Sequence, residues 1–370
     1  MSIPAQAAVN RIAGAAPVIE DVMIDDPREG EIRIAVRATG VCHTDMVMRD
    51  GHVPVPRPMV LGHEGAGIVE TTGPGVTGLQ PGDHVVLSFD SCGQCVSCQD
   101  DAPAYCHHWF PLNFGGGRAD GSTALRTRDG APIHSHVFGQ SSFATHAIVH
   151  ERNAVKVDKA LPLELLGPLG CGIQTGAGSV LNVLKPRPGS SIAVIGTGAV
   201  GISAIMAARI AGAGAIVALD LNADRVRLAQ ELGATHGFKA DDAAMEGHAA
   251  AAGCPAGFDY ILDTTGSPAV CNAAIPALAP RGELALVGAY PPGVAIEADG
   301  SFMMSGGRVV RGIVEGGADP QNFIPELIAH YQAGRFPFDR LVRYFDFADI
   351  AAAIEAGESG RVIKPIIRMP

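Results

Sequence analysis

Four cysteines lie close together at Cys92, Cys95, Cys98 and Cys106, in the spacing C-x2-C-x2-C-x7-C. This spacing lets one short segment surround a single ion, and four thiolates make a closed tetrahedral zinc site. The alternatives are two disulfides or unrelated thiols. Metal binding is favoured because the first residues, Met1 to Pro4, lack the basic and apolar regions of a secretory signal. We therefore expect a structural zinc and a reducing, cytoplasmic location, where thiols stay free.

Length and charge restrict the class of protein. A chain of 370 residues is too long for one simple core, so two domains are expected. Hydrophobic residues make up 47% and charged residues 18%, as in ordinary globular enzymes. The net charge of −11 makes the chain a poor non-specific partner for nucleic acid or an anionic membrane. A small-molecule partner is expected instead.

The hydrophobic pattern changes along the chain. The first 170 residues or so read as β-rich, with apolar runs separated by Gly/Pro turns. From Ser190 strands and helices alternate, which predicts a parallel, doubly wound sheet. The expected strands there are 191–195, 215–220, 260–263 and 283–287, and the expected helices are 199–211 and 223–232. Two further helices are expected at 321–333 and 347–356, before an apolar strand at 362–369 that returns to the first domain.

A glycine-rich turn opens the second half of the chain. Gly196, Gly198 and Gly201 form a G-x-G-x-x-G with Ala199 and Val200, between an expected strand and an expected helix. The glycines allow the tight turn, the approach of a pyrophosphate and close helix–strand packing. Asp220 comes 19 residues after Gly201, where a carboxylate accepts the ribose hydroxyls of NAD and repels the 2′-phosphate of NADP. The alternative is a structural turn with Asp220 as a helix-capping acid.

A second set of zinc-competent side chains is dispersed. Cys42 ends an expected strand, His63 and Glu64 lie in a glycine-rich turn, and Cys171 lies between two glycines. Two thiolates and one neutral imidazole balance Zn²⁺ and leave its fourth position open. Spacing cannot join residues so far apart, and a buried cysteine is usually just a small apolar side chain. Both interpretations stay open at this level.

Taken in order, the motifs resemble one family over essentially the whole chain. They are GVCHTD (40–45), GHEGAG (62–67), PGDHV (81–85), the four-cysteine lobe, GCG (170–172) and GTGAVG (196–201) with Asp220. The chain resembles the zinc-dependent medium-chain alcohol dehydrogenases. Residues 112–117 and 119–125 are most similar to the aryl-alcohol (benzyl alcohol) branch.

The resemblance implies an α/β fold. It has a GroES-like β-rich catalytic domain at 1–174 with both zinc sites and an NAD-binding Rossmann domain at 175–311. Residues 312–370 return to the catalytic domain. It also implies a homodimer or homotetramer.

The resemblance also implies roles for single residues. Cys42, His63 and Cys171 would bind a catalytic zinc, with Glu64 as a neighbouring or alternate ligand and Asp45 orienting His63. Thr44 would take the alcohol proton. The expected cofactor contacts are His43 and Arg361 at the pyrophosphate, Arg225 at the adenosine and Thr175 at the nicotinamide, with Gly196, Gly198, Ala199, Val200, Gly201 and Asp220. The two zincs and NAD are the expected cofactors.

One position departs from the liver- and yeast-type enzymes. They carry a histidine five residues after the first zinc cysteine, where it passes the proton to water, and this chain has Val47. The aryl-alcohol branch is similar to this chain in carrying an apolar residue there.

The resemblance implies NAD-dependent oxidation of a primary, aromatic alcohol to its aldehyde. A terpene allylic alcohol or a polyol is an alternative substrate. A non-catalytic NAD-binding protein or a zinc-free quinone reductase would be expected to lack zinc ligands or Thr44, which are present.

Overall fold

The computed structural model describes residues 2–242, 244–291 and 293–370. They form two compact units. The β-rich unit comprises 1–172, 319–328 and 339–370, and the nucleotide unit comprises 173–318 and 329–338. The division expected from the sequence, 1–174, 175–311 and 312–370, stays a prediction about folding domains. Among the described residues, no helix has both the length and the apolar character needed to cross a membrane.

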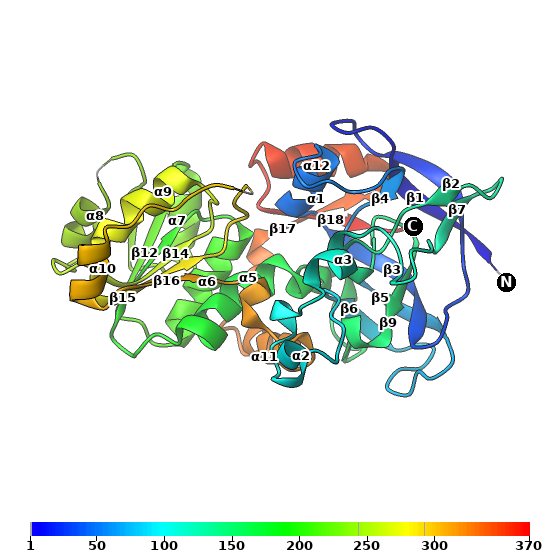
Figure 1. Ribbon diagram of the computed structural model, residues 1–370, viewed down its shortest axis with the longest axis horizontal. Coiled ribbons are helices and arrows are strands. Elements are labelled where there is room, and N and C mark those ends of the chain that lie inside the picture. Colours follow the sequence, from blue (N-terminus) through cyan, green and yellow to red (C-terminus); the bar gives the residue numbers. More distant parts are fainter. Residues whose placement is uncertain (1, 243, 292) are drawn as a thin grey trace. The chain divides into compact units, whose positions relative to one another are not determined.

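Two sheets build the β-rich unit (Figure 1). The first has the order β4-β1-β2-β7-β8, and the second has the order β10-β6-β5-β3-β18-β17 with β9 also paired to β3. The strands of the first are β1 (Ile3–Asn10), β2 (Val18–Ile24), β4 (Met59–Val60), β7 (Leu125–Thr127) and β8 (Pro132–Ile133). Those of the second are β3 (Glu31–Gly40), β5 (Gly65–Thr72), β6 (His84–Leu87), β9 (His146–His150), β10 (Ala154–Val157), β17 (Val342–Asp346) and β18 (Lys364–Arg368).

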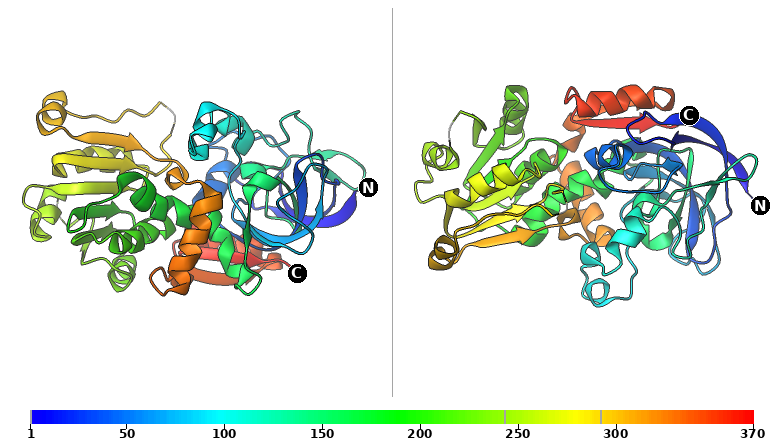
Figure 2. Two further views of the ribbon diagram at one scale, coloured as in Figure 1. Left: turned by 90° about the horizontal axis from the view of Figure 1, so that it is seen from below. Right: turned by 45° about the horizontal axis from the view of Figure 1, so that its top comes forward.

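The last strand joins the chain's end to its beginning. β18 pairs antiparallel with β3, so that Ile366 lies opposite Gly40, two residues before Cys42. Short helices connect the strands of this unit: α1 (His43–Arg49), α2 (Val96–Gln99), α3 (Trp109–Phe114), α4 (Leu163–Leu166) and α12 (Ile350–Glu358). The segment that carries the four clustered cysteines forms a lobe at the side of the sheets, coloured cyan in Figure 2.

The nucleotide unit contains one six-stranded parallel sheet of order β13-β12-β11-β14-β15-β16. Its strands are β11 (Ser191–Ile195), β12 (Ala215–Asp220), β13 (His236–Lys239), β14 (Phe258–Asp263), β15 (Leu278–Leu286) and β16 (Val309–Gly312). Its helices are α5 (Gly172–Gly178), α6 (Ala199–Ile210), α7 (Ala223–Glu231), α8 (Met245–Ala251), α9 (Pro268–Ala274) and α10 (Gly300–Gly306). Helix α11 (Pro320–Gln332) contributes residues to both units.

The alternation of strand and helix forms the parallel sheet that the sequence predicts. The near-continuous apolar runs Ile192–Ile195 and Ile216–Leu219 are buried, as strands covered on both faces require. The strand order reverses between β11 and β14, which is the point where doubly wound sheets bind ligands. The predicted fold class, a GroES-like β-rich part with a Rossmann sheet, is confirmed.

Candidate active site and metal centres

Asp45 holds two of the dispersed zinc-competent residues in place. It lies in the first turn of α1 and is fully buried. One carboxylate oxygen accepts the Cys42 N–H at 3.1 Å. The other accepts the Gly62 N–H at 3.0 Å and lies 2.9 Å from His63 Nδ1. A single side chain therefore fixes both the turn before His63 and the residue at the start of α1.

This contact also decides which nitrogen of His63 is available. Because the Asp45 carboxylate can only accept, Nδ1 carries a proton, and Nε2 is the nitrogen whose lone pair can bind a metal ion in place of a second proton. Nε2 is buried and has no hydrogen-bond partner within the described residues. A buried polar atom without a partner is costly and calls for an explanation, and a bound ion is one.

Cys171 completes the set. The ligand atoms of Cys42, His63 and Cys171 lie within 4.8 Å of one another. Cys171 is positioned by a close approach of two main-chain segments, at Gly170 and at Leu87. A side chain on the preceding Gly170 would place its Cβ 1.9 Å from the Leu87 carbonyl oxygen, and Ser88 Oγ donates to the Gly170 carbonyl at 2.7 Å. Two sulfurs and one imidazole nitrogen converging in a buried site fit Zn²⁺ with one position open.

The charges of the site suit a cation. The pKa of Cys42 lies well below its usual range because Cys171 donates a hydrogen bond to it, and because His63 and Lys364 are cationic neighbours. Burial lowers the pKa of His63, but the negative charges of Asp45 and Cys42 outweigh burial and raise it well above its usual value. The site therefore concentrates negative charge beside the imidazole, and a bound Zn²⁺ would take the place of the protons there.

The carboxylate of Glu64 forms an ion pair with Lys364, a residue that the sequence pattern did not single out. Lys364 Nζ lies 2.7 and 2.8 Å from the two carboxylate oxygens of Glu64 and 3.2 Å from the Val41 carbonyl. Glu64 is fully buried and Lys364 is 3% exposed. The available signal was a single lysine within the apolar terminal strand, since such a charge is buried only when it is paired.

A strained segment forms the wall on the other side of His63. His136, Phe138, Gly139 and Ser141 all have positive φ, which non-glycine residues rarely adopt. The Phe138 ring stacks on His63 with ring centroids 4.4 Å apart. Strain of this kind persists only where surrounding contacts over-determine it, and it clusters at functional sites.

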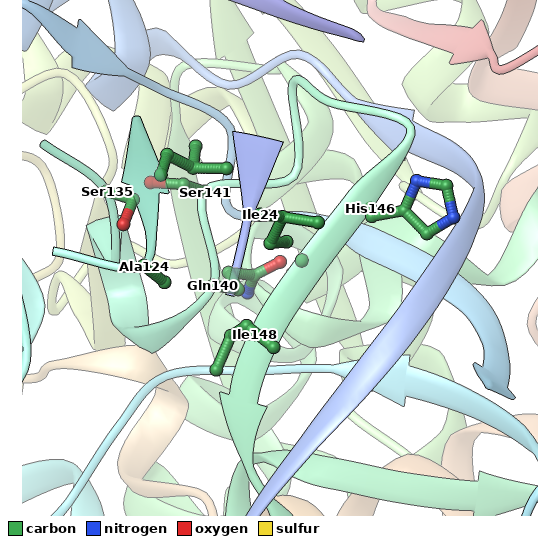
Figure 3. A pocket seen from close by; sticks show the side chains of 9 residues that line it. Ile24, Ala124, Ser135, Gln140, Ser141, His146 and Ile148 are labelled. Carbon is green, nitrogen blue, oxygen red and sulfur yellow. The ribbon is translucent and has the colours of Figure 1, made fainter. Parts of the chain in front are cut away.

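Gln140 belongs to the same segment and was also missed. Its Nε2 donates to the His63 carbonyl at 2.9 Å and its Oε1 accepts the Gly65 N–H at 3.0 Å. Gln140 also lines a small cavity with Ser135, Ser141 and His146 (Figure 3). With a volume of about 10 Å³, this cavity has room for about one water molecule, so it is not the place for an alcohol.

Thr44 lies beside the candidate zinc ligands. Its hydroxyl is 3.8 Å from Cys42 Sγ, in the first turn of α1. His43, one residue earlier, is exposed, and Val47 is half-buried on the same helix. His52 is exposed and donates its backbone N–H to the Val47 carbonyl at 3.0 Å.

The four clustered cysteines converge as their spacing predicts. Three of their sulfur–sulfur distances are 3.5 Å (Cys95–Cys98), 3.9 Å (Cys92–Cys98) and 3.9 Å (Cys95–Cys106). A tetrahedron with zinc–sulfur bonds of about 2.3 Å has edges of about 3.8 Å. All eight cysteines are free, and these distances far exceed the roughly 2.05 Å of a disulfide.

Backbone amides prepare these sulfurs for a cation. The N–H groups of Cys95 and His107 point at the sulfurs of Cys92 and Cys95, at 3.3 and 3.4 Å. The backbone N–H groups of Gln94 and Cys95 lower the pKa of Cys92 to about 5. Burial acts the opposite way on Cys106 and raises its pKa to about 12. Four converging thiols, of which Cys92 and Cys95 accept these backbone N–H groups, are a donor set that fits structural zinc.

The glycine-rich turn has the geometry of a dinucleotide site. Gly196 has a φ of +87°, and Gly201 packs so closely that a Cβ would lie 1.8 Å from the Gly196 carbonyl. Gly198, before Ala199 and Val200 at the start of α6, has no described atom within 4 Å of its Cβ position. One glycine makes the turn, one allows close packing, and one leaves room for phosphate at a helix N-terminus.

Asp220 stands at the end of β12 beside this turn. Its Oδ2 accepts both the N–H of Thr197 at 2.7 Å and its hydroxyl at 2.9 Å. The carboxylate is thus fixed against the turn that would hold the pyrophosphate. Arg225, on the following helix α7, has a buried Nε with no hydrogen-bond partner among the described residues.

Two other expected cofactor residues have their own partners. Thr175 Oγ1 donates to Glu315 Oε2 at 3.3 Å within the nucleotide unit. Arg361 is exposed and pairs with Glu355 at 2.9 Å after helix α12. Lys364, three residues later, is the buried cation of this segment, so the role of Arg361 stays a prediction.

Family models match two parts of the chain. Residues 28–159 match the alcohol dehydrogenase GroES-like domain, and residues 199–332 match the zinc-binding dehydrogenase family. A curated relative, geraniol dehydrogenase of Castellaniella defragrans, is 49% identical over 99% of this chain and 98% of its own length.

Solved structures cover the whole chain. An alcohol dehydrogenase zinc-binding domain protein from Burkholderia ambifaria is 51% identical with a TM-score of 0.97, over 100% of both chains. Benzyl alcohol dehydrogenase from Acinetobacter calcoaceticus is 44% identical with a TM-score of 0.95, again over 100% of both chains. These likenesses confirm the resemblance seen in the motifs. The chain therefore belongs to the zinc-dependent medium-chain alcohol dehydrogenases, a family that uses zinc and a nicotinamide dinucleotide as cofactors and small-molecule alcohols as substrates.

Proposed function

We propose that this enzyme oxidises primary alcohols with an aromatic ring next to the carbinol carbon, with NAD⁺ as oxidant and the aldehyde as product. The observation that carries the proposal is the Phe138 ring stacked on His63, at 4.4 Å between centroids. An aromatic wall next to the imidazole favours a flat, unsaturated substrate over a short aliphatic one.

Further rings extend this wall. Trp109 packs edge-on against Phe138 at 5.9 Å, Phe114 does so at 5.3 Å, and Phe89 lies 5.0 Å from Trp109. Phe89 and Phe138 are 3% and 5% exposed, so they make a rigid apolar surface. The similarity to benzyl alcohol dehydrogenase from Acinetobacter calcoaceticus supports the same substrate class.

The proposed roles follow from the chain's contacts. Cys42, His63 and Cys171 would hold the catalytic zinc, and Cys92, Cys95, Cys98 and Cys106 the structural one. When bound, zinc supplies a Lewis acid that lowers the pKa of the alcohol oxygen, and NAD⁺ accepts the hydride from the carbinol carbon. Asp45 keeps His63 in the tautomer whose Nε2 can bind metal. Glu64 is held by Lys364 and is an alternate ligand only when released from it.

The alcohol also loses a proton, and Thr44 is its proposed first acceptor. The Thr44 hydroxyl lies beside Cys42 and can accept one proton while it donates its own. Val47 cannot carry that proton further, so it leaves through water, the cofactor ribose or another histidine. Asp220, fixed by Thr197, selects NAD⁺. His43, Arg225, Arg361 and Thr175 complete the proposed cofactor contacts, and a homodimer or homotetramer is the proposed assembly.

An allylic terpenoid alcohol is the second candidate substrate. The observation that favours it is the 49% identity to geraniol dehydrogenase of Castellaniella defragrans. Geraniol shares with benzyl alcohol an unsaturated carbon next to the carbinol, so the two differ mainly in shape.

A substrate panel tests the proposal. Formation of NADH is measured with benzyl alcohol, geraniol, ethanol and a sugar alcohol, and kcat/KM for benzyl alcohol is expected to be highest. Phe138→Leu should lower kcat/KM for benzyl alcohol by about fivefold, since an aromatic contact contributes about 1 kcal/mol beyond its buried area. The rate with ethanol should change much less.

Phe110→Leu is the matched control, because Phe110 is 56% exposed and its ring stacks on Phe114. A higher kcat/KM for geraniol would favour the second candidate. Equal rates for ethanol and both unsaturated alcohols would refute the aromatic wall as the basis of specificity.

A further inference from the structure

The order of strands in the nucleotide unit assigns one end of the sheet to each half of a dinucleotide. The phosphate-binding turn follows β11, and Asp220, which would hold the adenosine ribose, ends the neighbouring β12. The other half of the dinucleotide must then extend over the carboxyl ends of β14, β15 and β16. Thr264, directly after β14, already touches the turn, since its hydroxyl donates to the carbonyls of Ile195 and Gly196 at 2.9 and 3.1 Å.

Glu315 lies at that end of the sheet. The backbone N–H of Ile313 still bonds to the Leu286 carbonyl of β15 at 2.9 Å, and Glu315 follows two residues later. Glu315 is 8% exposed, and its carboxylate accepts from Gln174 Nε2 at 3.1 Å and from Thr175 Oγ1 at 3.3 Å. Both of these donors are neutral, so they orient the carboxylate without adding a positive charge beside it.

The turn that carries Glu315 is unusual in its backbone. Glu315, Gly316 and Gly317 all have positive φ, and Glu315 has a φ of +48°. The turn presses onto α5, because a Cβ on Gly316 would lie 2.5 Å from the Gln174 carbonyl. A glutamate in this conformation costs free energy that an asparagine or glycine would not. A cost of this kind at a ligand-binding edge indicates that the side chain has a use.

We propose that Glu315 selects the redox state of the cofactor, because its carboxylate stabilises the cationic ring of NAD⁺ and not the neutral ring of NADH. The inference rests on the proposed NAD⁺ function and adds a specificity residue to it. Charge–charge attraction of this kind is long-range in a partly desolvated site, so direct contact is not required. Thr175, whose hydroxyl donates to Glu315, has its own proposed position beside the nicotinamide and links the carboxylate to that ring.

The test measures binding and needs no alcohol. Dissociation constants of NAD⁺ and NADH are measured by calorimetry and by NADH fluorescence, for the zinc-loaded enzyme and for Glu315→Gln. Glutamine keeps the size and an acceptor oxygen but removes the charge. We expect NAD⁺ to bind about tenfold more weakly and NADH to change less than twofold. The potential of the bound couple should therefore rise by about 30 mV, the equivalent of tenfold for two electrons.

Glu246→Gln is the matched control. Glu246 is exposed on α8 of the same unit, and its replacement by glutamine removes the same charge. It should leave the NAD⁺/NADH ratio of dissociation constants unchanged. A purely structural Glu315, which only ties the turn to α5, would weaken both cofactors together or neither.

A second variant covers the case in which Glu315→Gln does not fold. Gln174→Lys brings an ammonium group to the carboxylate without altering the strained turn, and it should shift the ratio in the same direction. An unchanged ratio in every folded variant would overturn the inference. If the unaltered enzyme binds neither NAD⁺ nor NADH, the proposed function itself fails, which is a distinct result.

Discussion

Lys364 and Glu64 form a buried ion pair behind the candidate catalytic metal site, with Nζ 2.7 and 2.8 Å from the two carboxylate oxygens. The two residues are 300 positions apart in the sequence. Burial raises the pKa of Glu64 and Lys364 opposes that rise. For Lys364, burial lowers the pKa, but Glu64 and Cys42 raise it more, so the ammonium stays protonated. Lys364 thereby holds the carboxylate of Glu64 and balances part of the negative charge of the two cysteines.

Breaking this pair should destabilise the β-rich unit. Lys364→Met leaves Glu64 as a buried, unpaired charge, and we expect a loss of about 3–5 kcal/mol in the free energy of unfolding. Adding Glu64→Gln to the same chain should recover at least half of that loss, because the unpaired charge is removed. Urea unfolding followed by circular dichroism measures both. Equal stability of the single and double variants would mean that the pair does not couple.

The two metal centres should respond differently to loss of a ligand. Cys95→Ser is expected to lower the yield of folded protein and to leave about one zinc per chain, because structural zinc contributes free energy to folding. Cys42→Ser should keep the fold and the four-cysteine zinc while alcohol oxidation is lost. Metal analysis with circular dichroism on each purified variant decides this. One zinc per chain in the fully active, unaltered enzyme would refute the two-site proposal.

Asp220 should set the preference for NAD⁺ over NADP⁺. Like-charge repulsion between its carboxylate and a 2′-phosphate of roughly 1–3 kcal/mol corresponds to about 5- to 150-fold in kcat/KM. Asp220→Ala should narrow that gap, mainly by weakening NAD⁺, since Thr197 also loses its acceptor. Steady-state kinetics with both cofactors tests this, and equal values in the unaltered enzyme would contradict it.

His136 should make the β-rich unit sensitive to mild acid. Burial, with a smaller contribution from Arg118, lowers the pKa of His136 from 6.5 to about 4. The unfolded chain therefore binds a proton at a higher pH than the folded chain does. The contribution of neutral His136 to the free energy of unfolding is fully present above pH 6.5 and is lost as the pH falls towards 4. The total loss is about 3 kcal/mol.

His136→Asn removes the titrating group and keeps a residue that tolerates the left-handed backbone at φ +66°. Its stability should decline less steeply between pH 6.5 and 4 than that of the unaltered chain. The comparison uses the slope of unfolding free energy against pH, which a constant change in packing does not affect. Parallel slopes would assign the acid sensitivity to other groups.

Short-range patterns in the sequence were enough for the local structures. The four cysteines lie within one loop, so their spacing alone limits how they can surround an ion, and their sulfurs do converge. The glycines at 196, 198 and 201 act through local φ angles and close packing within the turn and against the preceding strand. The parallel sheet could be predicted for the same reason, because the hydrophobic periodicity of each segment indicates locally whether it forms a strand or a helix.

Only the tertiary structure decided how the distant residues meet. Cys42, His63 and Cys171 come together because Asp45 accepts the N–H groups of Cys42 and of Gly62, the residue before His63, and because Gly170 lets two main chains touch. Lys364 reaches Glu64 through the antiparallel pairing of β18 with β3. Phe138 and Gln140 contact His63 from a segment with several positive φ angles, which its sequence pattern does not predict. Such contacts depend on strand register and backbone strain across the whole unit, and neither leaves a periodic signal along the chain.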